Sequence, residues 1–263
     1  VSALTDIAVC AGTPNPRFTA TNLVGTVHWF EENPGANGVP TSTEKSAATT
    51  FQPTGTAASP SYTIWAVQFA GGCYSPRTTA TYAINPIPNP PATVDTNICY
   101  NQPSLSVTAT GVSGAEIWWY SNNTKSKVLA SDSEGYRSKE TEVGTYTYYA
   151  TQWVNNCESQ PAAAVYRIKA LPSAPLIQGQ KNICTYDNAL TLTASGTNIT
   201  WYASDMTTKL STGASYLTTD MTYGNKKYYA SQTVEGCEGA KGPASYVINS
   251  KPENPVVTGA SMC

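Results

Sequence analysis

One short motif, Ala-x-Gln-x-x-x-x-Cys, occurs three times in the 263-residue chain at nearly even spacing, and this repetition constrains the fold more than any other feature. The motif cysteines are Cys73, Cys157 and Cys237, and a tyrosine lies nine residues after each of them. Prolines follow 15 and 18 residues after each cysteine and form a Pro-x-x-Pro segment. Self-similarity at a fixed period indicates tandem copies of one small domain.

A second series of cysteines marks the start of each copy. Its members, separated by 89, 85 and 79 residues, are Cys10, Cys99, Cys184 and Cys263. An alanine lies ten residues after each of the first three, and a tryptophan follows it. Proline cannot donate to a β-ladder, so the Pro-x-x-Pro segments indicate the junctions between domains. We therefore predict repeats at 1–87, 88–172 and 173–252, and the first strand of a fourth repeat at 253–263, in a segment of a longer array.

The second copy shows most clearly that the repeat is made of β-strands. Turn residues separate short segments rich in β-branched and aromatic residues, at Leu105–Thr110, Ile117–Tyr120, Tyr146–Gln152 and Ala163–Ile168. Several short strands with a turn about every ten residues are typical of a β-sandwich or barrel. The sequence therefore predicts an all-β chain.

The spacing of small and aromatic residues resembles that of an immunoglobulin domain. Ala109, Trp119 and Ala150 occupy the places of the Cys, Trp and Cys of that family. Tyr148 occupies the place of its tyrosine corner. The resemblance implies three tandem immunoglobulin-like β-sandwich domains arranged end to end, without the usual inter-sheet disulfide. The residues expected in the three cores are Ala20, Trp29, Ala66, Ala109, Trp119, Ala150, Ala194, Trp201 and Ala230.

The wider pattern of an early Cys, Trp-Tyr, Tyr-Tyr-Ala-x-Gln, Gly-Cys and Pro-x-x-Pro resembles the repeats of very large Bacteroidota surface proteins. That group includes adhesins of gliding bacteria exported by the type nine route, and filament proteins of predatory relatives. The resemblance covers essentially the whole chain. It implies attachment or mechanical linkage outside the cell.

The immunoglobulin-like strand order bears on how the cysteines pair. Local pairing, such as Cys99 with Cys157, is the usual arrangement, and free thiols are a further alternative. In the implied fold, however, these two cysteines lie at opposite poles, about 30 Å apart along the strands, whereas a disulfide needs Cα atoms within about 7 Å. We therefore favour bonds across junctions, which join Cys10 to Cys157 and Cys99 to Cys237. By the same rule Cys73 pairs with a preceding repeat, and Cys184 and Cys263 with following ones.

Composition and motifs argue against catalysis and against several classes of ligand. Charged residues make up 12% of the chain and the net charge is -2, so the basic patch of a nucleic-acid binder is missing. The chain has a single histidine, His28, and no Cys-x-x-Cys pair, so we expect no metal site and no cofactor. No stretch approaches the roughly 20 apolar residues of a membrane span. We expect a protein that is not an enzyme.

Aromatic residues recur at positions whose side chains should point away from the core, because side chains alternate along a strand. The predicted exposed aromatic face consists of Phe30, Trp65, Trp118, Tyr120, Tyr149, Trp153, Tyr202 and Tyr229. A repeated aromatic patch calls for an explanation. One is lateral packing, either between copies in a fibre or beneath a loop of the same domain. The other is a stacking platform for sugar rings.

These observations predict a structural and adhesive repeat array that is secreted or displayed at the cell surface, where disulfides persist. Its expected partners are further repeats of the same chain, other copies in a homo-oligomer or bundled filament, and surface glycans or another cell. The alternative is a set of accessory carbohydrate-binding modules of a secreted polysaccharide-degrading enzyme.

Overall fold

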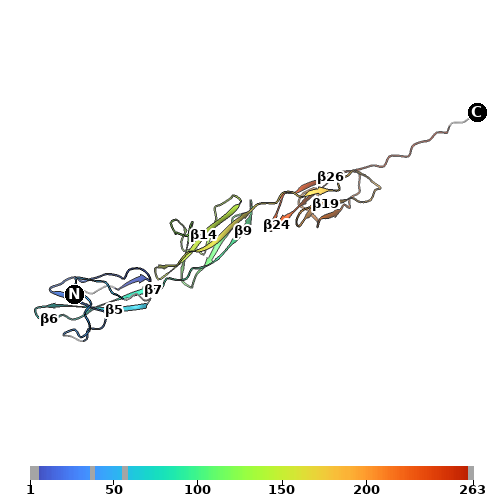
Figure 1. The fold of residues 1–263 in the computed structure, drawn as a ribbon. Coiled ribbons are helices and arrows are strands. Elements are labelled where there is room, and N and C mark those ends of the chain that lie inside the picture. The colour runs from blue at the N-terminus through green and yellow to red at the C-terminus, as the bar shows by residue number, and fades with distance from the viewer. Residues whose placement is uncertain (1–5, 36–38, 55–58, 260–263) are drawn as a thin grey trace, which may run out of the picture. The chain divides into compact units, whose positions relative to one another are not determined.

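The computed structural model describes residues 6–35, 39–54 and 59–259, and the regular elements within them are all β-strands (Figure 1). The strands group into sheets whose order is the same in the second and third repeats and is retained in part in the first. The contacts divide the chain into two compact units. The first comprises 1–96, 105–138 and 146–166, and the second comprises 97–104, 139–145 and 167–263. The division runs through the second repeat, because parts of that repeat associate with each neighbour.

The third repeat is a sandwich of two sheets. Its smaller sheet has the order β17-β19-β22, formed by Leu176–Gln178, Thr191–Ser195 and Ser215–Leu217. Its larger sheet has the order β18-β26-β23-β20-β21, formed by Ile183–Cys184, Gly242–Asn249, Gly224–Ser231, Thr200–Tyr202 and Lys209–Thr212. A short hairpin of β24 (Thr233–Val234) and β25 (Cys237–Glu238) extends beyond β23. Strand β18 pairs with β26 in parallel, and β26 pairs with β23 antiparallel.

The second repeat has the same two sheets. The smaller has the order β13-β10-β8, formed by Gly135–Arg137, Ser106–Thr110 and Ala92–Val94. The larger has the order β12-β11-β14-β16-β9, formed by Val128–Ala130, Glu116–Tyr120, Gly144–Val154, Ala162–Lys169 and Thr96–Cys99. Strand β15 (Cys157–Glu158) pairs with the end of β14. These strands contain or overlap the four segments predicted from the sequence.

The first repeat keeps four strands of the larger sheet, with only an isolated bridge between Trp29 and Ser46 in place of the fifth, and it reduces the smaller sheet. The larger has the order β1-β7-β5-β3, formed by Ile7–Cys10, Thr78–Asn85, Ser59–Ala70 and Thr26–Phe30, with β6 (Cys73–Tyr74) paired to β5. Among the described residues, the facing sheet consists of β2 (Phe18–Thr19) and β4 (Thr50–Phe51). The parallel pairing of β1 with β7 matches that of β18 with β26 in the third repeat.

The core of each repeat is built around one tryptophan that lies opposite an alanine on the neighbouring strand. Trp29 pairs with Ala66, Trp119 with Ala150, and Trp201 with Ala230. All nine side chains predicted to lie in the cores are buried, and the three indoles are completely inaccessible. Each indole N–H donates to a backbone carbonyl, of Ala48 at 2.8 Å and of Ser133 and Gly213 at 2.9 Å. A buried tryptophan needs such an acceptor, so the carbonyls hold the connecting segments against the core.

The described part of the last predicted segment, residues 253–259, contains no strand and is exposed. Cys263 lies outside the described residues. The fourth repeat therefore stays a prediction.

The tryptophan cores generate the first prediction. Replacing Trp119 with alanine removes a fully buried ring, and losses of about 3–5 kcal/mol are typical of such changes. Trp118→Ala is the matched control, because its half-buried ring lies on the outer face and contacts Trp153 there; we expect a loss of about 1 kcal/mol. Hydrogen exchange of second-repeat peptides in urea measures both changes. Equal losses in the two variants would contradict this account of the core.

Candidate functional site

We call β5, β14 and β23 the F strands and β7, β16 and β26 the G strands, and the hairpin between them, the F–G hairpin, is the same tight turn in every repeat. Two consecutive residues with positive φ form it, and they are Gly71-Gly72, Asn155-Asn156 and Glu235-Gly236. Two left-handed residues in a two-residue connection define the type I′ hairpin, for which Asn and Gly are favoured. The next residue is always the motif cysteine, which pairs with the last residue before the turn, as Val154 pairs with Cys157. The turn therefore fixes this cysteine at the tip of the sheet.

The other series of cysteines lies at the opposite end of the same sheet. Cys10 is in register with Asn85, and Cys184 with Asn249, where the parallel strands end. In the second repeat the strands end in the same way, because the N–H of Tyr100, the residue after Cys99, donates to the Lys169 carbonyl at 2.8 Å. Each cysteine is thus held beside the last residue of the G strand, in what we call the acceptor end of the repeat.

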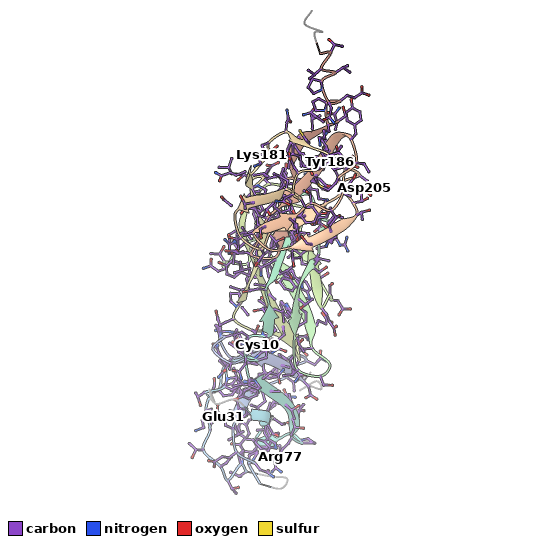
Figure 2. The ribbon with its side chains drawn as sticks, turned by 90° about the vertical axis from the view of Figure 1, so that its right-hand side faces the viewer. Cys10, Glu31, Arg77, Lys181, Tyr186 and Asp205 are labelled. Atoms are coloured by element: carbon purple, nitrogen blue, oxygen red, sulfur yellow. A yellow bond between two sulfur atoms is a disulfide. The ribbon has the colours of Figure 1, made fainter. Side chains whose placement is uncertain are left out.

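Two disulfides join acceptor ends to the F–G hairpins of following repeats. Cys10 is bonded to Cys157 and Cys99 to Cys237, each with a Cα–Cα distance of 5.6 Å. Figure 2 labels Cys10 at one end of the first repeat. These are the two pairs that the sequence analysis favours over local pairing. Of the remaining described cysteines, Cys73 is exposed and Cys184 partly buried, and both are free.

A hydrogen bond accompanies each disulfide. The Asn85 side-chain amide donates to the Asn155 carbonyl at 3.1 Å, and the Lys169 ammonium donates to the Glu235 carbonyl at 2.9 Å. The two donors occupy equivalent places at the end of the G strand, and the two acceptors are the first residues of the hairpin turns. The Glu235 carboxylate also lies 3.7 Å from Lys169, but its exposure makes this ion pair a weak contribution.

The glutamine of the Ala-x-Gln motif supplies a third connection. The Gln152 amide donates to the Asn89 carbonyl at 2.6 Å and its oxygen accepts from the Val112 N–H at 2.8 Å. Gln232 donates in the same way to the Ser173 carbonyl at 2.9 Å. Asn89 and Ser173 both lie inside Pro-x-x-Pro segments, so this glutamine fastens the linker to the repeat that follows it. This role of the glutamine was not predicted from the sequence, although its strict recurrence was a signal for it.

The predicted exposed aromatic face is wrong for four of its eight members. Phe30, Tyr120, Tyr202 and Tyr229 are buried, with at most 8% exposure. These positions lie opposite other members of the set on adjacent strands, Phe30 opposite Trp65, Tyr120 opposite Tyr149, and Tyr202 opposite Tyr229. Neighbours on the same face limit their exposure, as Lys241 does where its ammonium lies 4.0 Å from the centre of the Tyr202 ring. The remaining members are half-buried, namely Trp65, Trp118, Tyr149 and Trp153.

A carboxylate on the strand after the hairpin covers this face in the second repeat. Glu158 accepts from the Tyr120 hydroxyl at 2.7 Å, from Thr151 at 2.8 Å and from Lys125 at 2.9 Å. Burial is the strongest single influence on the Glu158 pKa and raises it, but the hydrogen bonds from Tyr120, Lys125 and Thr151 together outweigh burial and lower the pKa below its ordinary value. Burial and the neighbouring carboxylate raise the pKa of Tyr120 to about 12.

The third repeat repeats this arrangement, and the first replaces it. Glu238 accepts from the Tyr202 hydroxyl at 2.5 Å and from Ser231 at 2.7 Å, and the bond from Tyr202 is the main reason its pKa is lowered. In the first repeat the three equivalent positions, set by their distances from the repeat motifs, are Phe30, Val67 and Tyr74. The polar network has thus been exchanged as a set for a largely apolar one.

No arrangement suited to metal chemistry appears in the part of the chain that the structure describes. It contains no cluster of three or more His, Cys, Asp or Glu side chains that would hold an ion. None of its elements is a helix long and apolar enough to cross a membrane.

The third repeat matches a known family model, and solved structures show weaker similarity to the whole chain. Residues 172–249 match the family model described as "Ig-like domain CHU_C associated". The structure described as "Sidekick-1 immunoglobulin domains 1-5" is similar, with a TM-score of 0.38 and 17% identity over 95% of this chain and 58% of that chain. The I9-I11 tandem from titin gives a TM-score of 0.34 and 10% identity over 95% and 98% of the two chains. The chain therefore spans less than two thirds of the Sidekick-1 chain. No curated protein sequence matches it significantly.

The chain is a tandem array of immunoglobulin-like β-sandwich domains. Disulfide-linked arrays of this kind indicate an extracellular structural or adhesive role.

The junctions generate the second prediction. Digestion of the purified chain without reductant, followed by mass spectrometry, should yield the peptide pairs Cys10–Cys157 and Cys99–Cys237. These pairs form because the hairpin tip of one repeat lies at the acceptor end of the preceding repeat, which places the two cysteines within bonding distance. A Cys99–Cys157 peptide would contradict the cross-junction pairing. Digestion of a reduced and alkylated sample is the control and should release all four peptides singly.

The glutamate network generates the third prediction. Because the folded-state pKa of Glu158 is lowered, its stabilising effect is complete above the unfolded-state pKa of about 4.3 and is lost as the pH falls through the folded-state value. We expect Glu158→Gln to cost about 1–2 kcal/mol at pH 7 and progressively less in acid. Exchange protection of second-repeat peptides between pH 7 and 3 measures this. A cost that does not change with pH would argue against a role for the charge.

Proposed function

We propose that this chain is a tension-bearing part of a structural and adhesive array outside the cell, and that it has no catalytic role. The observation that carries the proposal is the placement of both disulfides between repeats rather than within them. A disulfide inside one domain protects that domain alone. A disulfide across a junction ties the positions of two domains together, which is the property that a load-bearing fibre needs.

The two disulfides overlap along the chain, and this shortens the covalent path on which a pulling force acts. They close loops of 147 and 138 residues. The shortest path from Cys10 to Cys237 crosses to Cys157, returns along the chain to Cys99, and crosses again. It therefore contains 58 residue steps (157 minus 99), whereas the reduced chain contains 227 (237 minus 10). Even a fully unfolded array would extend only a fraction of its contour length.

The linkers support the same role. The first two Pro-x-x-Pro segments are held to the following repeat by the recurring glutamine, through bonds of 2.6 Å to the Asn89 carbonyl and 2.9 Å to the Ser173 carbonyl. A proline-rich linker is already stiff, and a fixed linker restricts rotation of one domain about the next. The resemblance to Bacteroidota surface repeats supports attachment at a cell surface, in a homo-oligomer or bundled filament, with surface glycans or another cell as the target.

Accessory carbohydrate binding is the second candidate, and one aromatic pair favours it. Trp118 and Trp153 are both half-buried on the outer face, with ring centroids 5.5 Å apart. The equivalent positions in the third repeat are Thr200 and Thr233, so a sugar platform would be confined to particular repeats. Glycan binding that is lost in a Trp118→Ala, Tyr149→Ala double variant would favour this candidate.

The fourth prediction concerns extension under force. Stretching the chain by its ends should extend the region between Cys10 and Cys237 to about 200 Å when oxidised and about 800 Å when reduced, at about 3.5 Å per residue. All samples carry Cys73→Ser, Cys184→Ser and Cys263→Ser, so that no disulfide other than Cys10–Cys157 and Cys99–Cys237 can form. Single-molecule force spectroscopy with and without reductant measures the difference.

A matched control removes one disulfide, the bond between Cys99 and Cys237. With Cys99→Ser and Cys237→Ser, the shortest path follows the 80 steps from Cys157 to Cys237, or about 280 Å. Equal extension in oxidised and reduced wild-type chains would overturn the tension-bearing proposal.

A further inference from the structure

The third repeat carries an acceptor end in the same conformation as the two that hold hairpins. The backbone N–H after the cysteine donates to the last G-strand residue in all three cases, from Ala11, Tyr100 and Thr185 at 2.8, 2.8 and 3.0 Å. A second turn follows each time, because the N–H three residues after the cysteine donates to the cysteine carbonyl, at 3.1, 3.0 and 2.9 Å. Cys184 is therefore positioned as Cys10 and Cys99 are.

The side chains around Cys184 also correspond to those of a formed junction. Asn249 is exposed at the place where Asn85 and Lys169 bind the hairpin carbonyl. Tyr223 is 70% exposed. Its equivalent, Val143, lines a hollow together with Val234 and Glu235 of the third repeat's hairpin. Figure 2 shows Tyr186 at the end of the third repeat from which the last residues depart.

The first repeat carries the complementary half. Its hairpin has the same left-handed pair, Gly71-Gly72, followed by Cys73 in register with Ala70. In the two formed junctions the hairpin cysteines are buried, at 0% for Cys157 and 1% for Cys237, whereas Cys73 is exposed. The exposure of Cys73 is the difference expected between a hairpin without a partner repeat and one that is docked.

We propose that the acceptor end of the third repeat binds the F–G hairpin of another repeat of this type, and that the first repeat of a second chain supplies such a hairpin. The joint consists of a Cys184–Cys73 disulfide and a hydrogen bond from the Asn249 amide to the Gly71 carbonyl. Because the two surfaces differ, the contact is heterologous and adds chains head to tail without limit. This inference rests on the cross-junction bonding that also carries the proposed function.

The bond forms by thiol–disulfide exchange with a small disulfide such as oxidised glutathione. One cysteine thiolate attacks the small disulfide and releases one small thiol, which leaves a mixed disulfide on the protein. The second cysteine displaces the other small thiol and forms the Cys184–Cys73 bond. Two protein thiols are oxidised and one small disulfide is reduced to two thiols, so atoms and electrons balance.

The test uses the full chain with Cys263→Ser, so that Cys73 and Cys184 are the only thiols outside the two disulfides. Isotopically light and heavy chains are mixed and oxidised with glutathione disulfide. We expect a ladder in multiples of 27.9 kDa on a non-reducing gel, and Cys73–Cys184 peptides that join light to heavy chains. Mixing a Cys73→Ser chain with a Cys184→Ser chain should stop the ladder at the dimer.

The identity of the disulfide-linked peptides distinguishes specific docking from random oxidation. Docking predicts Cys73–Cys184 peptides in at least tenfold excess over Cys73–Cys73 and Cys184–Cys184, and a several-fold slower dimer formation with Asn249→Ala. A statistical mixture of the three linkages, or no interchain linkage, would overturn the proposal. The same digests report Cys10–Cys157 and Cys99–Cys237. Loss of these two pairs would defeat the proposed function, whereas their survival with random cross-links would defeat the docking inference alone.

Discussion

The pairing of the first edge strand with the last strand of each larger sheet, parallel in the first and third repeats, is the constraint on which the junctions depend. It places one cysteine beside the end of the G strand, while the type I′ hairpin places the other before that strand begins. Strands β16 and β26 are each eight residues long, which is about 26 Å at the usual rise. The two cysteines of one repeat are therefore too far apart to bond, and each can reach only a neighbouring repeat.

The junction combines connections that tolerate different substitutions. The disulfide and the glutamine bond are made by the same residue types at both junctions. The bond to the hairpin carbonyl is made by asparagine in one case and lysine in the other, because a backbone acceptor requires only a donor of sufficient reach. A backbone carbonyl also leaves the turn residue free to vary, as Asn155 and Glu235 do.

The outer faces show how repeats diverge while the core stays constant. Tyr120, Thr151 and Glu158 form a hydrogen-bonded set in which each polar group depends on the others, since a buried hydroxyl or carboxylate without a partner is costly. Phe30, Val67 and Tyr74 at the same positions avoid that requirement together. Replacing one member alone would leave an unpaired group, which explains why the set differs as a whole between repeats.

The sequence by itself determined the main strands of the second repeat, the three cores and the pole at which each described cysteine lies. Alternation, turn residues and the recurrence of Trp and Ala are local signals, and strand length converts them into distances. Only the tertiary structure decided which polar atoms meet across the junction, such as the Gln152 amide and the Asn89 carbonyl, and which aromatic side chains of the outer face are buried. Those contacts depend on strand register and on how one repeat contacts the next, and the spacing of residues along one strand predicts neither.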